Sequence, residues 1–322
     1  MKYFSSTFQE YITKCEKFNL HKNLNPLFNS LNNDIKKQNN LIFYGPSGTG
    51  KYTQALNYIK KYSATNLRFE RKITFNFNNK KQYIFNVSDI HFEIDMSLLG
   101  CHAKLLFNDI YYHVLNILSA RTNRTGIIIC KNFHHIHSEL LDIFYSYMQT
   151  LQHKNLKIFF ILITEQISFI PINILNRCQI IPFKRPTKNN YSKATSKTLM
   201  SNIQYVKDIV NIKDIQSKIG NLFNINKIIC DKILVLIKNY NDIHFLNLRD
   251  ILYEIFIYNL NIYACLNYIL MNLIKESYID EKNTDKILIK LYKFLKLYNN
   301  NYRPIYHLES FIFYLCIVIH EL

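Results

Sequence analysis

One glycine-rich segment carries the strongest chemical signal in the chain. It follows the apolar run Leu41–Tyr44 and opens a helical pattern, which is the setting of a phosphate-binding loop. Its glycines allow backbone N–H groups to turn toward phosphate oxygens, the helix N-terminus adds a positive field, and the lysine neutralises the outer phosphates. The alternative is a glycine turn without a ligand. The residues predicted to bind nucleotide are Gly45, Pro46, Ser47, Gly48, Thr49, Gly50, Lys51, Tyr52 and Thr53.

Two features of the loop and its neighbourhood argue against efficient hydrolysis. The residue after Lys51 is Tyr52, where a Ser or Thr hydroxyl normally binds Mg²⁺, and Thr53 comes one position late. A hydrolytic site also needs an Asp at the end of a neighbouring apolar strand. The run Gly126–Cys130 ends instead in Lys131 and Asn132, while the other central run ends in Thr164 and Glu165, which offers a rival acid. We therefore predict nucleotide binding with little or no hydrolysis, and Mg²⁺ at this site is in doubt.

Alternating apolar runs and helical patterns predict the framework around this loop. Three runs read as buried strands, and helical spacing lies between them, which is typical of a parallel sheet covered on both faces. A further pair of runs predicts a hairpin. The expected strands are 41–44, 126–130, 157–164 and the hairpin 73–77 with 82–87, and the expected helices are 53–62, 104–119 and 138–151.

The second half of the chain has a different character. Residues 186–198 are polar and lack apolar periodicity, so they are predicted to be a linker. The sequence beyond is expected to be all-helical, most clearly over 284–298, where apolar residues share one face and Lys286, Lys290 and Lys293 lie opposite. The predicted division is an α/β nucleotide-binding domain over 1–186, a linker and helical lid over 187–239, and a C-terminal helical domain over 240–322.

Composition limits the possible classes of protein. With 40 Lys and Arg against 23 Asp and Glu, the net charge of the 322 residues is +17, and residues 1–186 contribute +12 of it. This charge indicates an acidic partner such as nucleic acid, although an AT-rich gene would raise the lysine content too. No run is long enough to cross a membrane, and no secretory signal is expected. The seven cysteines form no CxxC pair, and His134, His135 and His137 lack further ligands nearby, so no metal site is expected.

Several stretches together resemble the AAA+ clamp-loader family, and among its members the third small subunit of replication factor C. LIFYGPSGTGKYTQAL is similar to that subunit's phosphate loop, and IHFEIDMSLLG to a segment that precedes a helix there. GIIICKNFHHIHSELLDIFYSYMQ and ILITEQISFIPINILNRCQIIPF resemble the second nucleotide motif and the sensor strand. The loop with EIDMSLLGC also resembles versions from large DNA viruses. The resemblance covers about residues 40–186.

The resemblance implies roles for three further residues. Arg177 matches an arginine finger that reaches the nucleotide of the adjacent subunit, although Asn176 replaces the usual serine before it. Thr164 falls at the sensor-one position, with Glu165 beside it. Lys104 falls where the family contacts DNA. The family also implies an α/β AAA+ domain, a helical lid and a C-terminal collar.

The implied function is that of a clamp-loader small subunit holding ATP or ADP. Its partners would be other subunits of a ring, expected to be a pentamer, a sliding clamp and primer–template DNA, with no membrane. It would work in the nucleus or at a cytoplasmic viral replication site. Two alternatives stay open: an active ATPase of another DNA-replication or packaging machine, and a scaffold with an empty phosphate loop.

Overall fold

The computed structural model describes residues 7–77, 81–149, 156–195, 209, 211–212, 225–239, 244–258, 260–300 and 303–321. The chain divides into two compact units, Met1–Lys218 and Ile219–Leu322. Most of the segment predicted to form the lid lies outside the described residues. The three-domain division therefore stays a prediction.

The first unit is built on a seven-stranded sheet in the order β2-β3-β4-β5-β6-β1-β7. The strands from β4 to β7 pair in parallel, whereas β2, β3 and β4 pair antiparallel. All strands predicted from the sequence are present, and β4 and β7 are additional. The bounds are Asn40–Tyr44 for β1, Arg71–Phe77 for β2, Lys81–Val87 for β3, His91–Asp95 for β4, Thr125–Lys131 for β5, Lys157–Thr164 for β6 and Cys178–Pro182 for β7.

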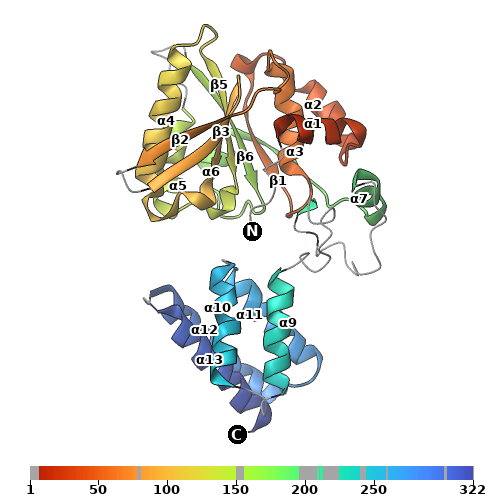
Figure 1. Cartoon of the computed structure of the whole chain (residues 1–322), viewed down its shortest axis with the longest axis vertical. Helices are drawn as coiled ribbons and strands as arrows, with labels where there is room; N and C mark the ends of the chain where they lie inside the picture. The colour runs from red at the N-terminus through yellow and green to blue at the C-terminus, as the bar shows by residue number, and fades with distance from the viewer. Residues whose placement is uncertain are drawn as a thin grey trace. The chain divides into compact units, whose positions relative to one another are not determined.

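Helices cover both faces of this sheet, as Figure 1 shows. Alternate strand residues point to opposite faces, so Ile42 packs with α4 and α5 while Leu41 and Phe43 pack with α1, α2 and α3. This confirms the predicted α/β domain with a covered sheet. The bounds are Phe8–Lys17 for α1, Asn25–Ser30 for α2, Lys51–Ile59 for α3, Ala103–Ser119 for α4, Ser138–Tyr147 for α5 and Ile172–Leu175 for α6.

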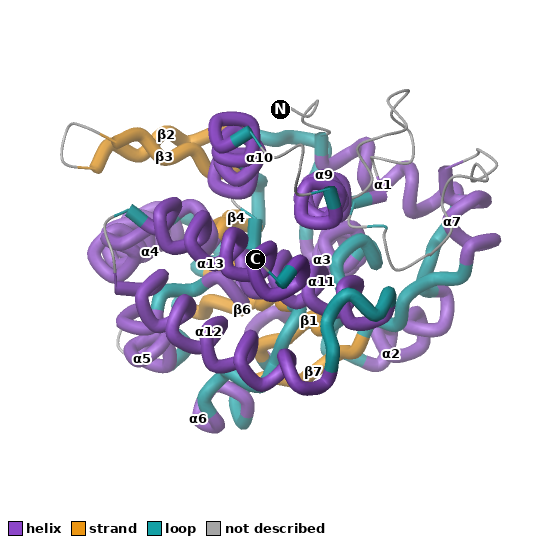
Figure 2. The backbone as a smooth tube through the Cα atoms, turned by 90° about the horizontal axis from the view of Figure 1, so that it is seen from below, coloured by secondary structure: helices purple, strands orange, loops and turns teal. Residues whose placement is uncertain are grey.

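The hairpin of β2 and β3 forms one edge of the sheet (Figure 2). It joins the parallel strands through a short antiparallel contact, in which Val87 of β3 is opposite Phe92 of β4. The strand β4 therefore connects the hairpin to the parallel part of the sheet. Its side chains His91 to Ile94 are all buried.

One sequence prediction is wrong in this unit. The segment predicted as a linker contains a helix, α7 (Lys188–Thr195). Its polar composition hid the helix, because only two of its side chains, Tyr191 and Thr195, are buried. Tyr191 is fully buried and donates a hydrogen bond from its hydroxyl to the carbonyl oxygen of Gly48, at 2.9 Å. Tertiary contact with the phosphate loop thus outweighs weak local periodicity.

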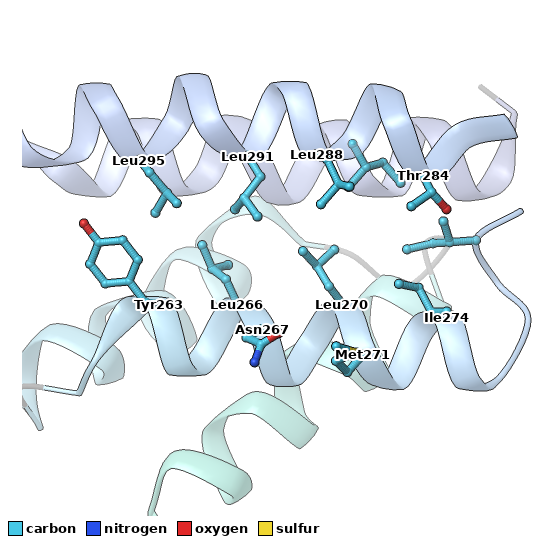
Figure 3. Close-up of a pocket in the computed structure, with 12 residues that line it drawn as sticks. Tyr263, Leu266, Asn267, Leu270, Met271, Ile274, Thr284, Leu288, Leu291 and Leu295 are labelled. Carbon is cyan, nitrogen blue, oxygen red and sulfur yellow. The ribbon is translucent and has the colours of Figure 1, made fainter. Parts of the chain in front are cut away.

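The second unit is helical, as predicted. Its helices are α9 (Ile225–Lys238), α10 (Phe245–Ile257), α11 (Ile262–Lys275), α12 (Glu281–Asn300) and α13 (Pro304–His320). Fully buried side chains such as Ile233, Ile269 and Leu308 form one apolar core, to which α9 contributes together with the helices after residue 240. An open groove of about 240 Å³ lies between α11 and α12 (Figure 3).

No helix within the described ranges combines the length and apolarity that crossing a bilayer would require. The most apolar of them, α13, keeps seven of its side chains buried in the second unit, including Phe311 and Ile312. Its apolar surface is therefore used for packing within the helical bundle.

Candidate nucleotide-binding site

The predicted phosphate loop joins the end of β1 to the first residue of α3. Gly48 and Gly50 have φ angles of 68° and 86°, in the left-handed region that favours glycine. At Gly45 a Cβ atom would lie 2.5 Å from the carbonyl oxygen of Phe183, because β7 pairs closely alongside. The three glycines are therefore required by the backbone path of this loop, which supports the sequence interpretation of the segment.

Two side chains hold the loop from outside. The ring atom Nε2 of His21 lies 2.7 Å from the carbonyl oxygen of Thr49, and the hydroxyl of Tyr191 bonds to the carbonyl oxygen of Gly48. The hydroxyl of Thr49 donates to the carbonyl oxygen of Pro46 at 3.0 Å. Each bond engages a carbonyl oxygen, the backbone group that would repel a phosphate. The loop is thus fixed before any anion arrives, which lowers the entropic cost of binding one.

Lys51 is buried at the start of α3 and donates hydrogen bonds to the carbonyl oxygens of Gly45 and Pro46, the latter at 2.8 Å. Burial lowers the pKa of its ammonium group to about 8; Glu165 opposes this shift and Arg185 adds to it. An anion in the loop would relieve this desolvation by supplying opposite charge. Lys51 is therefore placed to change partners from carbonyl oxygens to phosphate.

A cavity of about 440 Å³ opens in front of the loop. Besides loop residues Ser47 to Thr53, side chains from α1, the ends of β5 and β6, and the segment before the second unit line it. They are Tyr11, Lys14, Asn132, His134, Ile163, Thr164, Glu165, Asn211 and Ile212. The volume suits a small ligand, and the polar groups converge at the carboxyl ends of parallel strands, where α/β proteins bind their ligands.

A buried ionic cluster occupies the neighbourhood where a metal would be expected. Tyr52 donates its phenolic hydrogen to Oε1 of Glu93 at 2.6 Å, and Nζ of Lys131 lies 3.1 Å from Oε2. His91 approaches the same carboxylate at 3.4 Å. Burial opposes ionisation of Glu93, but the hydrogen bond from His91 and the charge of Lys131 outweigh it and hold the pKa at about 2. Glu93 is therefore an ionised carboxylate whose partners are the side chains of Tyr52, Lys131 and His91.

These donors do not form a magnesium site. The phenol of Tyr52 points to Glu93, whose carboxylate already has an internal cation in Lys131. The amide of Asn132 donates to Asp95 at 3.0 Å. Within the part of the chain that the structure describes, His, Cys, Asp and Glu side chains form no group of three or more suited to a metal. Nucleotide sites usually hold Mg²⁺ with one or two carboxylates together with phosphates and water, whereas the carboxylate of this cluster already binds Tyr52 and Lys131.

The structure places Thr164 in the cavity, fully buried at the end of β6. Its hydroxyl donates to the carbonyl oxygen of Gln166 at 2.6 Å and accepts from the Gln166 N–H at 3.3 Å. Glu165 lines the same cavity beside it. Their roles toward a nucleotide stay predictions.

Arg177 and Lys104 lie elsewhere. Arg177 is exposed just after α6, with its guanidinium group 5.8 Å from the centre of the Tyr145 ring, and it does not belong to the described residues that line the cavity. Lys104 is exposed in the first turn of α4. Both assignments stay predictions.

Sequence reasoning missed four residues that shape the site: His21, Glu93, Tyr191 and, as a cavity residue, His134. Glu93 carried a weak signal, since it is an acid inside the apolar stretch 90–94. A buried acid needs a partner. His21 and Tyr191 carried no local signal, because they reach the loop from distant segments.

Comparison with known proteins gives distant likenesses only. No family model and no curated protein matches the chain. Among solved structures, Rif2 of Saccharomyces cerevisiae is similar with a TM-score of 0.37 and 13% identity, over 65% of this chain and 72% of that one. A single-substitution variant of RuvB from Thermotoga maritima is similar with a TM-score of 0.36 and 12% identity, over 73% and 67%. No inference about function is drawn from likenesses of this degree.

Proposed function

We propose that this chain binds ATP or ADP at its phosphate loop, cuts it poorly or not at all, and serves as a small subunit of a clamp loader of the replication factor C type. The observation that carries the nucleotide-binding part is the fixed loop with buried Lys51 at its end. Its three glycines, two outer hydrogen bonds and lysine form one arrangement that suits an anion.

The cluster of Tyr52, Glu93 and Lys131 supports the absence of efficient hydrolysis. A carboxylate and a hydroxyl that would hold Mg²⁺ in an active site are replaced by an ammonium group and a phenol, which both bind Glu93. Without a metal at the outer phosphates, the charge that develops during transfer lacks its main stabiliser. The chain's contribution would then be to hold nucleotide.

The exposed position of Arg177 is compatible with action on a neighbouring subunit, and this part of the proposal rests on the sequence resemblance. In a ring, each arginine finger would complete the site of the next subunit. The net charge of +17 and the exposed Lys104 agree with contacts to DNA phosphates, which are independent of base sequence and weaken with salt.

Equilibrium binding of labelled ATP to the purified chain tests the central claim. We expect Lys51→Ala to weaken binding at least about tenfold, because an interaction with a charged group contributes about 1.5–3 kcal/mol. Lys36→Ala, at an exposed lysine away from the cavity, is the matched control and should bind as the wild type does. No turnover above buffer is expected with Mg²⁺ present.

The outcomes separate the three possible functions. Binding without turnover supports a nucleotide-holding subunit. Robust turnover by the isolated chain would favour an active ATPase, and no binding at any concentration would favour a scaffold. Purification of the chain with its natural partners then tests the ring: a sliding clamp among them supports the clamp-loader role, and a chain that works alone contradicts it.

A further inference from the structure

His134 is a cavity residue that the proposed function has not used. It follows β5 in the short turn Phe133–His135, and it lines the same cavity as Lys51. Asn132 before it has a left-handed φ of 51°, and Phe133 is fully buried against the ring of Phe144. The turn is therefore fixed by its neighbours, and it places His134 at the cavity.

The ring carries a polar atom that lacks a partner. Nδ1 of His134 is buried and makes no hydrogen bond within the described structure. Its ring packs against His135, with ring centres 4.2 Å apart. A buried nitrogen without a partner is uncommon, because each such group loses its hydration without compensation. A ligand in the cavity would be one way to satisfy this imidazole.

The charges around the ring keep it neutral when the cavity holds no anion. Burial lowers the pKa of His134 to about 4, and the charges of His135 and of Lys51 on α3 act in the same direction, while Asp95 after β4 opposes them. Lys14 of α1 and Glu165 after β6 are the other charged residues that line the cavity. An anion beside Lys51 would change this balance, because it favours the protonated imidazole.

We propose that His134 binds the outermost phosphate of the nucleotide together with Lys51, and that the imidazole takes up one proton from solvent as it does so. No covalent bond changes between heavy atoms: the proton passes from water or buffer to the ring, and the resulting cation pairs with a phosphate oxygen. The proposal rests on nucleotide binding at this loop. It deepens that function, because a proton on His134 supplies positive charge in the cavity where Tyr52 takes the place of the usual magnesium-binding hydroxyl.

Calorimetric titration of the full chain with ATP, in EDTA and at pH 6.5, measures this proton directly. Two buffers with different ionisation enthalpies give the number of protons taken up. The comparison is between wild type and His134→Gln, with His137→Gln as control, since His137 is exposed and near in sequence. Protons that ATP itself releases or takes up contribute equally to the measurements on the wild type and the two variants. Lys51 takes up no further proton, because it is already charged at this pH.

We expect the wild type and His137→Gln to take up more protons than His134→Gln, by up to about one per nucleotide. We also expect His134→Gln to bind ATP about tenfold more weakly at pH 6, because a charge-assisted hydrogen bond is lost, with the difference narrowing toward pH 8. Thermal unfolding of each variant verifies that it is folded.

Equal proton uptake and equal affinity of wild type and His134→Gln would overturn the role of His134 while leaving nucleotide binding intact. Failure of the wild type to bind ATP at any pH would overturn both. A loss of affinity in His134→Gln that is the same at pH 6 and pH 8, with no change in proton uptake, would assign His134 a packing role and also contradict the proposal.

Discussion

The two units of this protein differ in the polar and charged side chains that they bury. In the first unit, Lys51, His91, Glu93 and Thr164 are buried at or near the phosphate loop. In the described part of the second unit, the one buried charged side chain is Glu309, which accepts a hydrogen bond from Arg249 at 2.9 Å. Because burial of polar groups costs free energy, their concentration near the loop makes this region the candidate functional site.

The two cavities repeat this contrast. The groove between α11 and α12 is lined by apolar side chains such as Leu270 and Leu288, with Asn267 and Thr284 as polar exceptions (Figure 3). The cavity at the phosphate loop has Lys14, Lys51 and Glu165 among its lining residues. A converging set of charges selects a charged ligand, whereas the described lining of the groove contains no charged side chain to pair with one. The first unit is therefore the place to look for ligand binding.

The largest expected effect is a loss of stability in the second unit. It tests whether apolar packing is what stabilises that unit. Ile269 of α11 is fully buried in its core. Replacing it with Ala should lower the free energy of unfolding by about 2–5 kcal/mol, through lost burial and the cavity left behind. Denaturant unfolding measures this loss. The folded fraction should bind ATP with unchanged affinity, because the cavity at the phosphate loop belongs to the first unit. A large fall in affinity would contradict the assignment of ligand binding to the first unit alone.

The next effect concerns the ionic cluster. Glu93→Gln keeps the shape of the side chain but removes the charge that Lys131 and His91 face. A pKa held near 2 instead of 4.5 corresponds to about 3 kcal/mol of stability at neutral pH, so the variant should be less stable by about that amount.

The pH dependence of the free energy of unfolding tests the value of about 3 kcal/mol. Since the pKa of Glu93 is lowered by folding, its contribution is complete above pH 4.5 and is lost as the pH falls toward 2. The difference between wild type and Glu93→Gln in urea unfolding should therefore narrow as the pH falls from about 5 to about 3. A difference that stays constant over this range would show that packing, not charge, is what Glu93 supplies.

The smallest expected effect concerns the outer support of the loop. Tyr191→Phe removes the hydroxyl that bonds to Gly48 but keeps the buried ring. We expect a loss of about 1 kcal/mol in unfolding free energy, as for a typical hydrogen bond, and a few-fold weaker binding of ATP. Tyr145→Phe, at a half-buried ring whose hydroxyl contacts Arg177 outside the cavity, is the matched control. Unchanged ATP affinity in Tyr191→Phe would show that the hydrogen bond from α7 to the loop does not contribute to ATP binding.

Local patterns were sufficient for much of the first unit. The strand β6 and the helix α4 were predicted within one residue of their bounds, because a continuous apolar run marks the strand and helical apolar spacing marks the helix. The helix α7 was missed, since its sequence is polar and only Tyr191 and Thr195 are buried. The strand β4 was missed as an element, although its residues had been singled out by resemblance.

By itself, the sequence determined the phosphate loop, the lysine at its end and the absence of an acid after β5, since each depends on residues next to one another in the chain. Only the tertiary structure decided that Glu93 lies between Tyr52 and Lys131, and that Tyr191 reaches Gly48 from 143 positions away. The reason is physical: strand order and register bring distant residues together, and no local spacing encodes which strand becomes the neighbour of which.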